Sequence, residues 1–160
     1  MRILVICLAL SLISGPSFAT KWTKQGASWG GAVSTDFSIL AVRAQSNAKK
    51  TTGRLLFEMG LGTGHPTCCE IPFYHLEVDN EKQRAVLTVT RTYRSKWGSS
   101  EIVRLIERSR FVEMATVEVE PTERSMVITV YLKEKMSMRV KKVISKDRRA
   151  FLALDMRKIK

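Results

Sequence analysis

The sequence predicts an all-β protein that folds as a two-layer β-sandwich, with one short helix in the middle of the chain. Three observations carry this prediction. Apolar and polar residues alternate with a period of two over most of the chain, which is typical of strands with one buried face. Clusters of Asn, Asp, Gly and charged residues separate the alternating segments, as they do in hairpins. A spacing of three to four between apolar residues, which indicates a helix, occurs once.

Four strands are expected before the helix. The alternation is clear where Leu55, Phe57 and Met59 fall on one face of the same segment. Turn-forming residues at 47–53 and at 79–82 join neighbouring strands into hairpins. The expected strands are residues 37–43, 54–59, 73–78 and 84–93, with a loop over residues 60–72.

A short helix is expected over residues 100–108. Either of the two serines before Glu101 can cap its N-terminus, and Glu101 itself suits the positive end of the helix dipole. The apolar residues that share one helical face are Ile102, Leu105 and Ile106. This pattern predicts a helix with one buried side.

Four further strands are expected after the helix, so the chain divides into two similar halves. The strands are residues 111–119, 125–133, 137–145 and 150–156, and the halves are residues 34–93 and 110–160. Each half closes with an apolar strand that follows a charged turn, at residues 81–89 and again at 146–154. An internal duplication would produce this pattern, and so would any two unrelated hairpins with basic turns. Both interpretations stay open.

The first nineteen residues have the features of a secretory signal peptide. A positive start at residues 1–2 precedes an almost wholly apolar segment at 3–13, and small residues occupy the two positions that a signal peptidase recognises before the expected cleavage after Ala19. The apolar stretch is shorter than the about 20 residues that a membrane span needs. We therefore expect a single domain over residues 20–160, with no transmembrane span, in the periplasm or outside the cell.

The charge of the chain favours anionic partners. Lys and Arg number 27 against 15 Asp and Glu, which gives a formal net charge of +12, and removal of Arg2 with the signal peptide leaves +11. A field of this sign attracts anions. Outside the cytoplasm the available anions are peptidoglycan and other anionic envelope polymers, lipid headgroups and acidic proteins. Nucleic acid is not an expected partner of an exported chain.

A basic residue and an apolar strand stand near the end of each half, followed in the second half by an Asp. The residues concerned are Arg149, Phe151, Leu152, Leu154 and Asp155 in the second half, and Arg84, Val86 and Leu87 in the first. This pattern resembles the closing signature of AMIN domains. Thr90 stands where the first half would carry its Asp, and the family's usual proline before the basic residue is missing from both halves. The resemblance spans about residues 37–158.

The AMIN resemblance implies a function as well as a fold. AMIN domains are exported β-sandwiches found in wall amidases and type IV pilus secretins. They localise their proteins by binding peptidoglycan, and they have no catalytic activity of their own. For this chain the resemblance therefore implies a wall-binding domain.

Aromatic and basic residues outside the expected strands are the candidates for ligand binding. The candidate residues are Trp22, Trp29, Lys96, Trp97, Arg148 and Arg149. Tryptophan beside cations suits stacking on sugar rings or resting at a lipid interface. The alternative is that the N-terminal tryptophans cover the sandwich and the charges only keep it soluble.

Both histidines and both cysteines of the mature chain lie within residues 65–75. Adjacent Cys68 and Cys69 are awkward joint metal ligands, and His65 and His75 complete no regular zinc spacing, so no metal or cofactor is expected. A disulfide between the two cysteines would close a strained ring, because adjacent Cα atoms are about 3.8 Å apart. We expect at least one thiol to pack under the loop as a small hydrophobe, and a crosslink to another chain is the third option.

No catalytic residue is expected, because no motif marks a reaction. The expected function is that of a non-catalytic binding domain of a bacterial envelope, in contact with peptidoglycan or a wall-associated complex. The first alternative is an assembly or scaffold factor that binds another envelope protein. The second is a small hydrolase or metal-binding protein built on the segment with Cys68, Cys69, His65 and His75. A wall binder requires a basic face, a scaffold an open hydrophobic edge, and an enzyme a pocket where a histidine meets a cysteine.

Overall fold

The computed structural model describes residues 21–32, 35–47 and 51–159. The expected signal peptide lies outside these residues. The described part of the chain forms ten strands and one helix. They are β1 (Gly26–Gly30), β2 (Phe37–Ser46), β3 (Thr52–Leu61), β4 (Tyr74–Asp79), β5 (Arg84–Thr90), β6 (Thr92–Ser95), α1 (Ser99–Glu107), β7 (Val112–Glu120), β8 (Ser125–Leu132), β9 (Met136–Ile144) and β10 (Ala150–Lys158).

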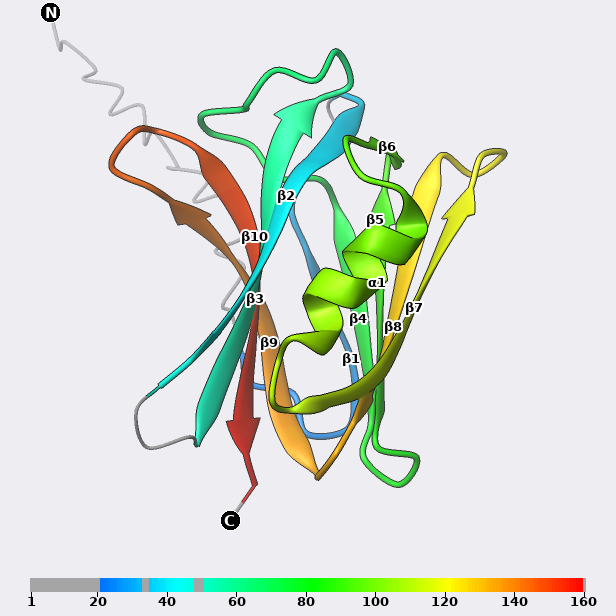
Figure 1. The fold of residues 1–160 in the computed structure, drawn as a ribbon, viewed down its shortest axis with the longest axis vertical. Coiled ribbons are helices and arrows are strands. Elements are labelled where there is room, and N and C mark those ends of the chain that lie inside the picture. The colour runs from blue at the N-terminus through cyan, green and yellow to red at the C-terminus, as the bar shows by residue number, and fades with distance from the viewer. Residues whose placement is uncertain (1–20, 33–34, 48–50, 160) are drawn as a thin grey trace, which may run out of the picture.

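Two five-stranded sheets pack together as a sandwich, which confirms the predicted fold class (Figure 1). One sheet has the order β1-β4-β5-β8-β7 and is called the β5 sheet below. The other has the order β6-β2-β3-β10-β9 and is called the β10 sheet. All neighbours pair antiparallel except β2 and β6, which are parallel.

Each half of the chain contributes one hairpin to each sheet. The first half places β2 and β3 in the β10 sheet and β4 and β5 in the β5 sheet, whereas the second half places β7 and β8 in the β5 sheet and β9 and β10 in the β10 sheet. Strands β2, β3, β4 and β5 of the first half therefore correspond to β7, β8, β9 and β10 of the second. With this correspondence, the order β4-β5-β8-β7 in one sheet becomes β9-β10-β3-β2, which is the order of these strands in the other sheet read in reverse. An internal duplication requires this arrangement, and a common origin of the halves stays a prediction.

The core lies between the sheets and is built from alternate residues of each strand. In β10, Leu152, Leu154 and Met156 face the core cluster, and each is almost fully buried. The intervening residues, among them Asp155 and Arg157, face the other side of the sheet because successive side chains of a strand point in opposite directions. The polar alternate positions of the β10 sheet thus form an outer surface.

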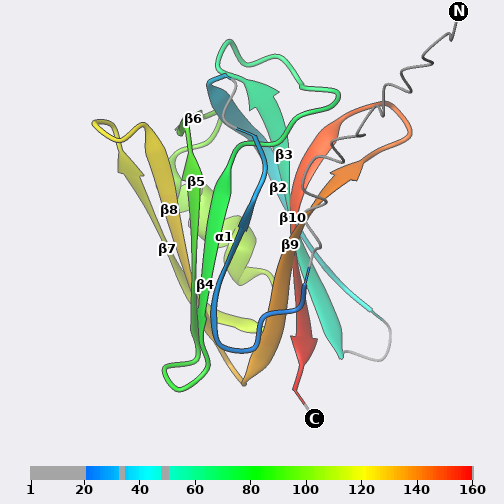
Figure 2. The same ribbon diagram turned by 180° about the vertical axis from the view of Figure 1, so that it is seen from behind.

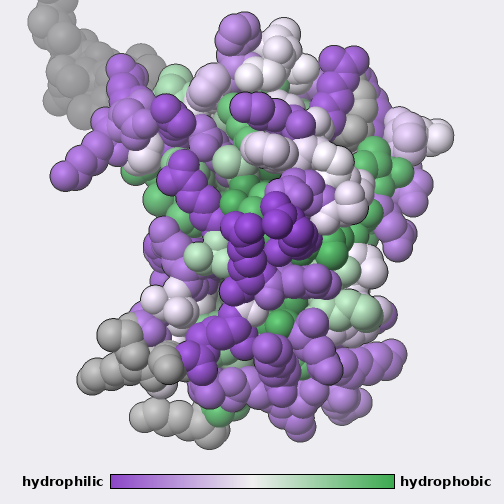
Figure 3. All heavy atoms as spheres, in the orientation of Figure 1, coloured by the Kyte–Doolittle hydropathy of each residue, from purple (hydrophilic) through white to green (hydrophobic). Residues whose placement is uncertain are grey.

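Helix α1 closes one open side of the sandwich. It lies between β2 of one sheet and β7 of the other (Figure 1), and its Ile102 and Ile106 are completely buried. Figure 3 shows this face: hydrophilic side chains cover the outer side of the helix, and hydrophobic residues appear in the seams beside it. Arg104 donates to Glu101 one turn earlier on the exposed side, at 2.6 and 2.9 Å. The buried spacing confirms the predicted helix.

The opposite side is closed by residues 21–30, the N-terminal strap (Figure 2). Thr23 pairs with Met138 of β9, and β1 then pairs with β4, so the strap joins the edges of the two sheets. Asn80, buried in the turn after β4, fastens it. Its side-chain amide donates to the carbonyl oxygens of Lys24 and of Met136, the latter at 2.8 Å, and accepts from the Met136 amide at 2.9 Å.

The structure differs from the predicted elements at three points. Neither serine before Glu101 caps α1, because its N-cap is Gly98 and no side-chain hydrogen bond caps it. Strand β1 was not expected, and Trp29 lies in it rather than in a loop. The segment expected as one strand over residues 84–93 is divided by Arg91, whose φ of +52° breaks the extended backbone. At this break the chain passes from β5 in the β5 sheet to β6 in the β10 sheet.

Candidate anion-binding groove

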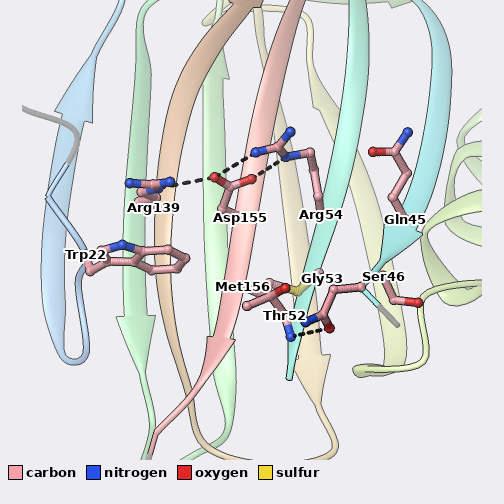
Figure 4. A pocket seen from close by; sticks show the side chains of 10 residues that line it. Trp22, Gln45, Ser46, Thr52, Gly53, Arg54, Arg139, Asp155 and Met156 are labelled. Atoms are coloured by element: carbon pink, nitrogen blue, oxygen red, sulfur yellow. Dashed lines mark hydrogen bonds and ion pairs between the residues drawn. The ribbon is translucent and has the colours of Figure 1, made fainter. Parts of the chain in front are cut away.

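A row of charged side chains crosses the outer surface of the β10 sheet. The strand register places Asp155 of β10 between Arg54 of β3 and Arg139 of β9. Arg54 donates to the Asp155 carboxylate at 2.5 and 3.2 Å, and Arg139 donates to it at 3.1 Å (Figure 4). Lys141 of β9 lies 3.6 Å from the same carboxylate. Three cations thus surround one anion, so the row keeps an excess of positive charge.

The cations also fix the ionisation of Asp155. Burial on its own would raise the pKa of this carboxyl group, but the hydrogen bond from Arg54 and the charges of Arg54 and Lys141 outweigh burial and lower the pKa. The hydrogen bond with Asp155 in turn raises the pKa of Arg54. Asp155 is therefore an anion at neutral pH, and it anchors the cations around it.

Trp22 of the strap lies against two guanidinium groups. The Arg139 guanidinium carbon is 4.5 Å from the centroid of the indole ring, and that of Arg157 is 4.4 Å from it. Both distances suit a cation–π contact. We call Trp22, Arg139 and Arg157 the arginine–tryptophan cluster. Because its ring is engaged by arginines of the same chain, Trp22 orients cations and presents less of itself to a sugar than the sequence indicated.

Two hollows adjoin this cluster. The first has a volume of about 320 Å³ and is partly shown in Figure 4. Its lining residues are Trp22, Gln45, Ser46, Asn47, Thr52, Gly53, Arg54, Arg139, Asp155 and Met156. The amide and hydroxyl groups among them can accept and donate hydrogen bonds, as sugar hydroxyl groups require.

The second hollow has a volume of about 550 Å³ and is called the basic hollow below. Its lining residues are Lys24, Thr51, Thr52, Ser137, Arg157, Lys158 and Ile159. The described residues that line it include three cations and no carboxylate. The two hollows share Thr52, and Trp22 of the first contacts Arg157 of the second. The two hollows and the cluster between them are together called the basic groove below.

The predicted candidates Arg148 and Arg149 lie far from this groove. Arg149 and Arg157 are eight residues apart along the chain, which corresponds to roughly 26 Å in an extended strand. Arg149 is bound within the chain: its guanidinium donates to the buried Glu58 at 3.1 Å and lies 2.9 Å from Asp147. Arg148 occupies the turn with a φ of +59°. Arg149 therefore supports the sheet, and replacing it would deprive Glu58 of its closest cation.

The other tryptophans lie elsewhere. Trp29 of β1 is 59% exposed and pairs with His75 on the outer side of the β5 sheet. Trp97 precedes α1, where its indole nitrogen donates to the Leu40 carbonyl oxygen at 2.9 Å and the Lys96 amine lies 5.7 Å from its ring. The candidate tryptophans thus form no common surface, and only Trp22 belongs to the groove.

The cysteine segment is an exposed loop. Cys68 and Cys69 are both exposed, so the expectation that at least one thiol packs under the loop is wrong. Their sulfur atoms are 2.9 Å apart without a disulfide bond. A hollow of about 290 Å³ is lined by Cys69, but neither His65 nor His75 is among the described residues that line it. The described chain also holds no group of three or more His, Cys, Asp and Glu side chains suited to a metal.

The cysteine pair predicts a measurable reactivity. The hydrogen bond with the Cys68 thiol raises the pKa of the Cys69 thiol. The thiolate is the reactive form of cysteine, so we expect Cys69 of the reduced wild-type protein to be alkylated slowly. In the Cys68→Ala variant, Cys69 should be alkylated severalfold faster at pH 8. Iodoacetamide labelling followed by peptide mass spectrometry over a range of pH tests this. A labelling midpoint that stays at the same pH in both proteins would contradict it.

No known family model, curated protein or solved structure matches this chain. The AMIN resemblance therefore stays a prediction. Among the described residues no helix is long and apolar enough to cross a membrane.

Part of the groove is predictable from the sequence. Trp22 is one of the predicted binding residues, and Asp155 belongs to the pattern that resembles AMIN domains. Arg54, Arg139 and Ser137 are not among the predicted binding residues. Their signal was present, because a polar residue at every second position of an apolar strand predicts a side chain on the outer surface of its sheet.

Proposed function

We propose that this chain is a non-catalytic binding domain of the cell envelope, and that it holds an anionic polymer in the basic groove. Peptidoglycan, with any anionic polymer attached to it, is the first candidate. The observation that carries the proposal is the arginine–tryptophan cluster, which lies between two hollows and carries more positive charge than the single carboxylate beside it balances.

The chemistry of the cluster suits carboxylates and phosphates. A guanidinium group presents N–H donors in a planar fork that matches both anions. Arg139 is held on one side by Asp155 and on another by Trp22, so little side-chain freedom remains to be lost on binding. Carboxylates of the wall peptides would meet these donors, while the polar groups of the first hollow would meet sugar hydroxyl groups.

Export is part of the proposal. It rests on the positive start, apolar segment and small terminal residues of residues 1–19. A groove for an anionic envelope polymer can meet its ligand only in an exported protein. The N-terminus of protein purified from an envelope fraction should then be Thr20.

Binding to purified sacculi tests the proposed function. We expect the folded protein to sediment with sacculi at 0.1 M salt and to lose most of this binding at 1 M, because the Debye length shrinks from about 10 Å to about 3 Å. Arg139→Gln should bind weakly at 0.1 M salt. Arg108→Gln removes the same charge at the exposed end of α1 and should bind like the wild type. Folded wild-type protein that stays in solution at 0.05 M salt would contradict the proposal.

A scaffold that binds another envelope protein is the second candidate. On the outer side of the β5 sheet, Trp29 is 59% exposed and Met114 is 48% exposed. The register places His75, Thr88 and Val127 in one row with Trp29, so this row holds no Lys, Arg, Asp or Glu until Glu118 of β7 ends it. This face, rather than a strand edge, would receive the partner. A photo-crosslinker at position 29 that couples one envelope protein, in cells where sacculus binding is absent, would favour the scaffold.

A further inference from the structure

The basic hollow is lined by a buried hydroxyl group that no described residue uses as a hydrogen-bond partner. Ser137 of β9 is only 1% exposed, and its hydroxyl group has no hydrogen-bond partner among the described residues. It pairs with Arg157 of β10 and precedes Met138, which pairs with Thr23 of the strap. Buried hydroxyl groups almost always have a partner. Ser137 lines the hollow, so a group bound there can supply that partner.

The charge around Ser137 identifies the kind of group. Lys24 and Arg157 form no ion pair with any described residue, and Lys158 is paired with Glu134 at 2.8 Å. Thr51 adds a hydroxyl group whose oxygen already accepts from the Asn47 amide at 3.1 Å, which leaves its hydrogen free to donate. The hollow thus offers positive charge and hydroxyl donors from four segments: the strap, the turn before β3, and strands β9 and β10.

We propose that the basic hollow binds the phosphoryl group of a phosphorylated glycan, and that the adjoining first hollow receives the sugar that carries it. This inference rests on the proposed function and names the class of its ligand. A phosphoryl group has three non-bridging oxygens and up to two negative charges, so it can use more donors than a carboxylate with two oxygens. Thr52, which lines both hollows, marks the point where the phosphoryl group would join the sugar.

Binding of glucose 1-phosphate, compared with glucuronate and glucose, tests the inference. Two-dimensional NMR of the folded mature chain should show glucose 1-phosphate shifting the amide signals of Ser137 and Thr52, with an affinity at least tenfold above that of glucuronate. Ser137→Ala should weaken the binding of glucose 1-phosphate about threefold and Lys24→Gln about tenfold. Lys133→Gln removes the same charge from an exposed turn and should change nothing. Thermal unfolding confirms that each variant is folded.

The alternative outcomes separate this inference from the proposed function. Equal affinities for glucose 1-phosphate and glucuronate, or shifts confined to residues away from Ser137, would overturn the phosphoryl site. If sacculi bind and glucose 1-phosphate does not, the phosphoryl site fails and the proposed function stands. If glucose 1-phosphate binds at Ser137 and sacculi do not, the phosphoryl site stands and the wall-binding function fails.

Discussion

Replacing Asp155 by asparagine is expected to lower the free energy of unfolding by about 3 kcal/mol, because loss of one partner from a buried ion pair leaves the other charges uncompensated. Asp155 is 5% exposed and is held by Arg54, Arg139 and Lys141. These cations keep 27–32% of their side-chain surface exposed, so water offsets part of the loss. Urea unfolding at pH 7 measures the change.

Asp147→Asn is the matched control. Its carboxylate lies 2.9 Å from Arg149, but its side chain is 62% exposed. An exposed ion pair contributes about 0–1 kcal/mol, so this variant should unfold close to the wild type. Equal effects of the two substitutions would show that the row around Asp155 is no more than a surface arrangement.

Asp155 also predicts how stability depends on pH. The pKa of its carboxyl group is lower in the folded protein than in the unfolded chain, where it is about 3.9. The folded state therefore gains stability above that value and loses it as the pH falls through the folded pKa. In Asp155→Asn this part of the acid-induced loss should disappear, so the stability difference between the two proteins should shrink as the pH falls below about 4.

The fold was predictable because a strand with one buried face alternates apolar and polar residues with a period of two. In β8, Met126, Ile128 and Val130 alternate with residues on the outer side, and the core contains all three. Strand β1 carries no such signal, since its backbone pairing with β4 defines it and its Trp29 faces outward. The break at Arg91 depends on a single backbone angle that no residue pattern marks.

The site was less predictable because the alternation of residues along a strand does not determine which residues of neighbouring strands lie beside each other. Alternation assigns Arg139 and Arg157 to an outer surface, but only the pairing of β9 with β10 brings them beside each other. The contact with Trp22 depends further on the strap, which crosses to β9 at Thr23. Arg149 shows the converse: a basic residue in a turn is a reasonable ligand candidate until the fold places the buried Glu58 beside it.

Replacing Trp22 by alanine is expected to weaken sacculus binding at least tenfold while leaving the fold intact. Each guanidinium group beside the indole ring gains about 0.5–2 kcal/mol from it, and loss of two such contacts frees both arginines to move. Trp22 lies outside the buried core, so the unfolding midpoint should change little. Co-sedimentation with sacculi at 0.1 M salt, over a range of protein concentrations, measures the half-saturation point.

Two further variants determine whether Trp22 acts through the arginines. Trp22→Phe keeps an aromatic ring, which attracts a cation less strongly than indole does, so its binding should fall between those of wild type and Trp22→Ala. Trp29→Ala removes an equally large but more exposed ring from the other sheet and should bind normally. If Trp29→Ala loses binding and Trp22→Ala keeps it, the ligand lies on the β5 sheet. In that case the cations of the groove serve the stability of the β10 sheet, because Asp155 would still require them.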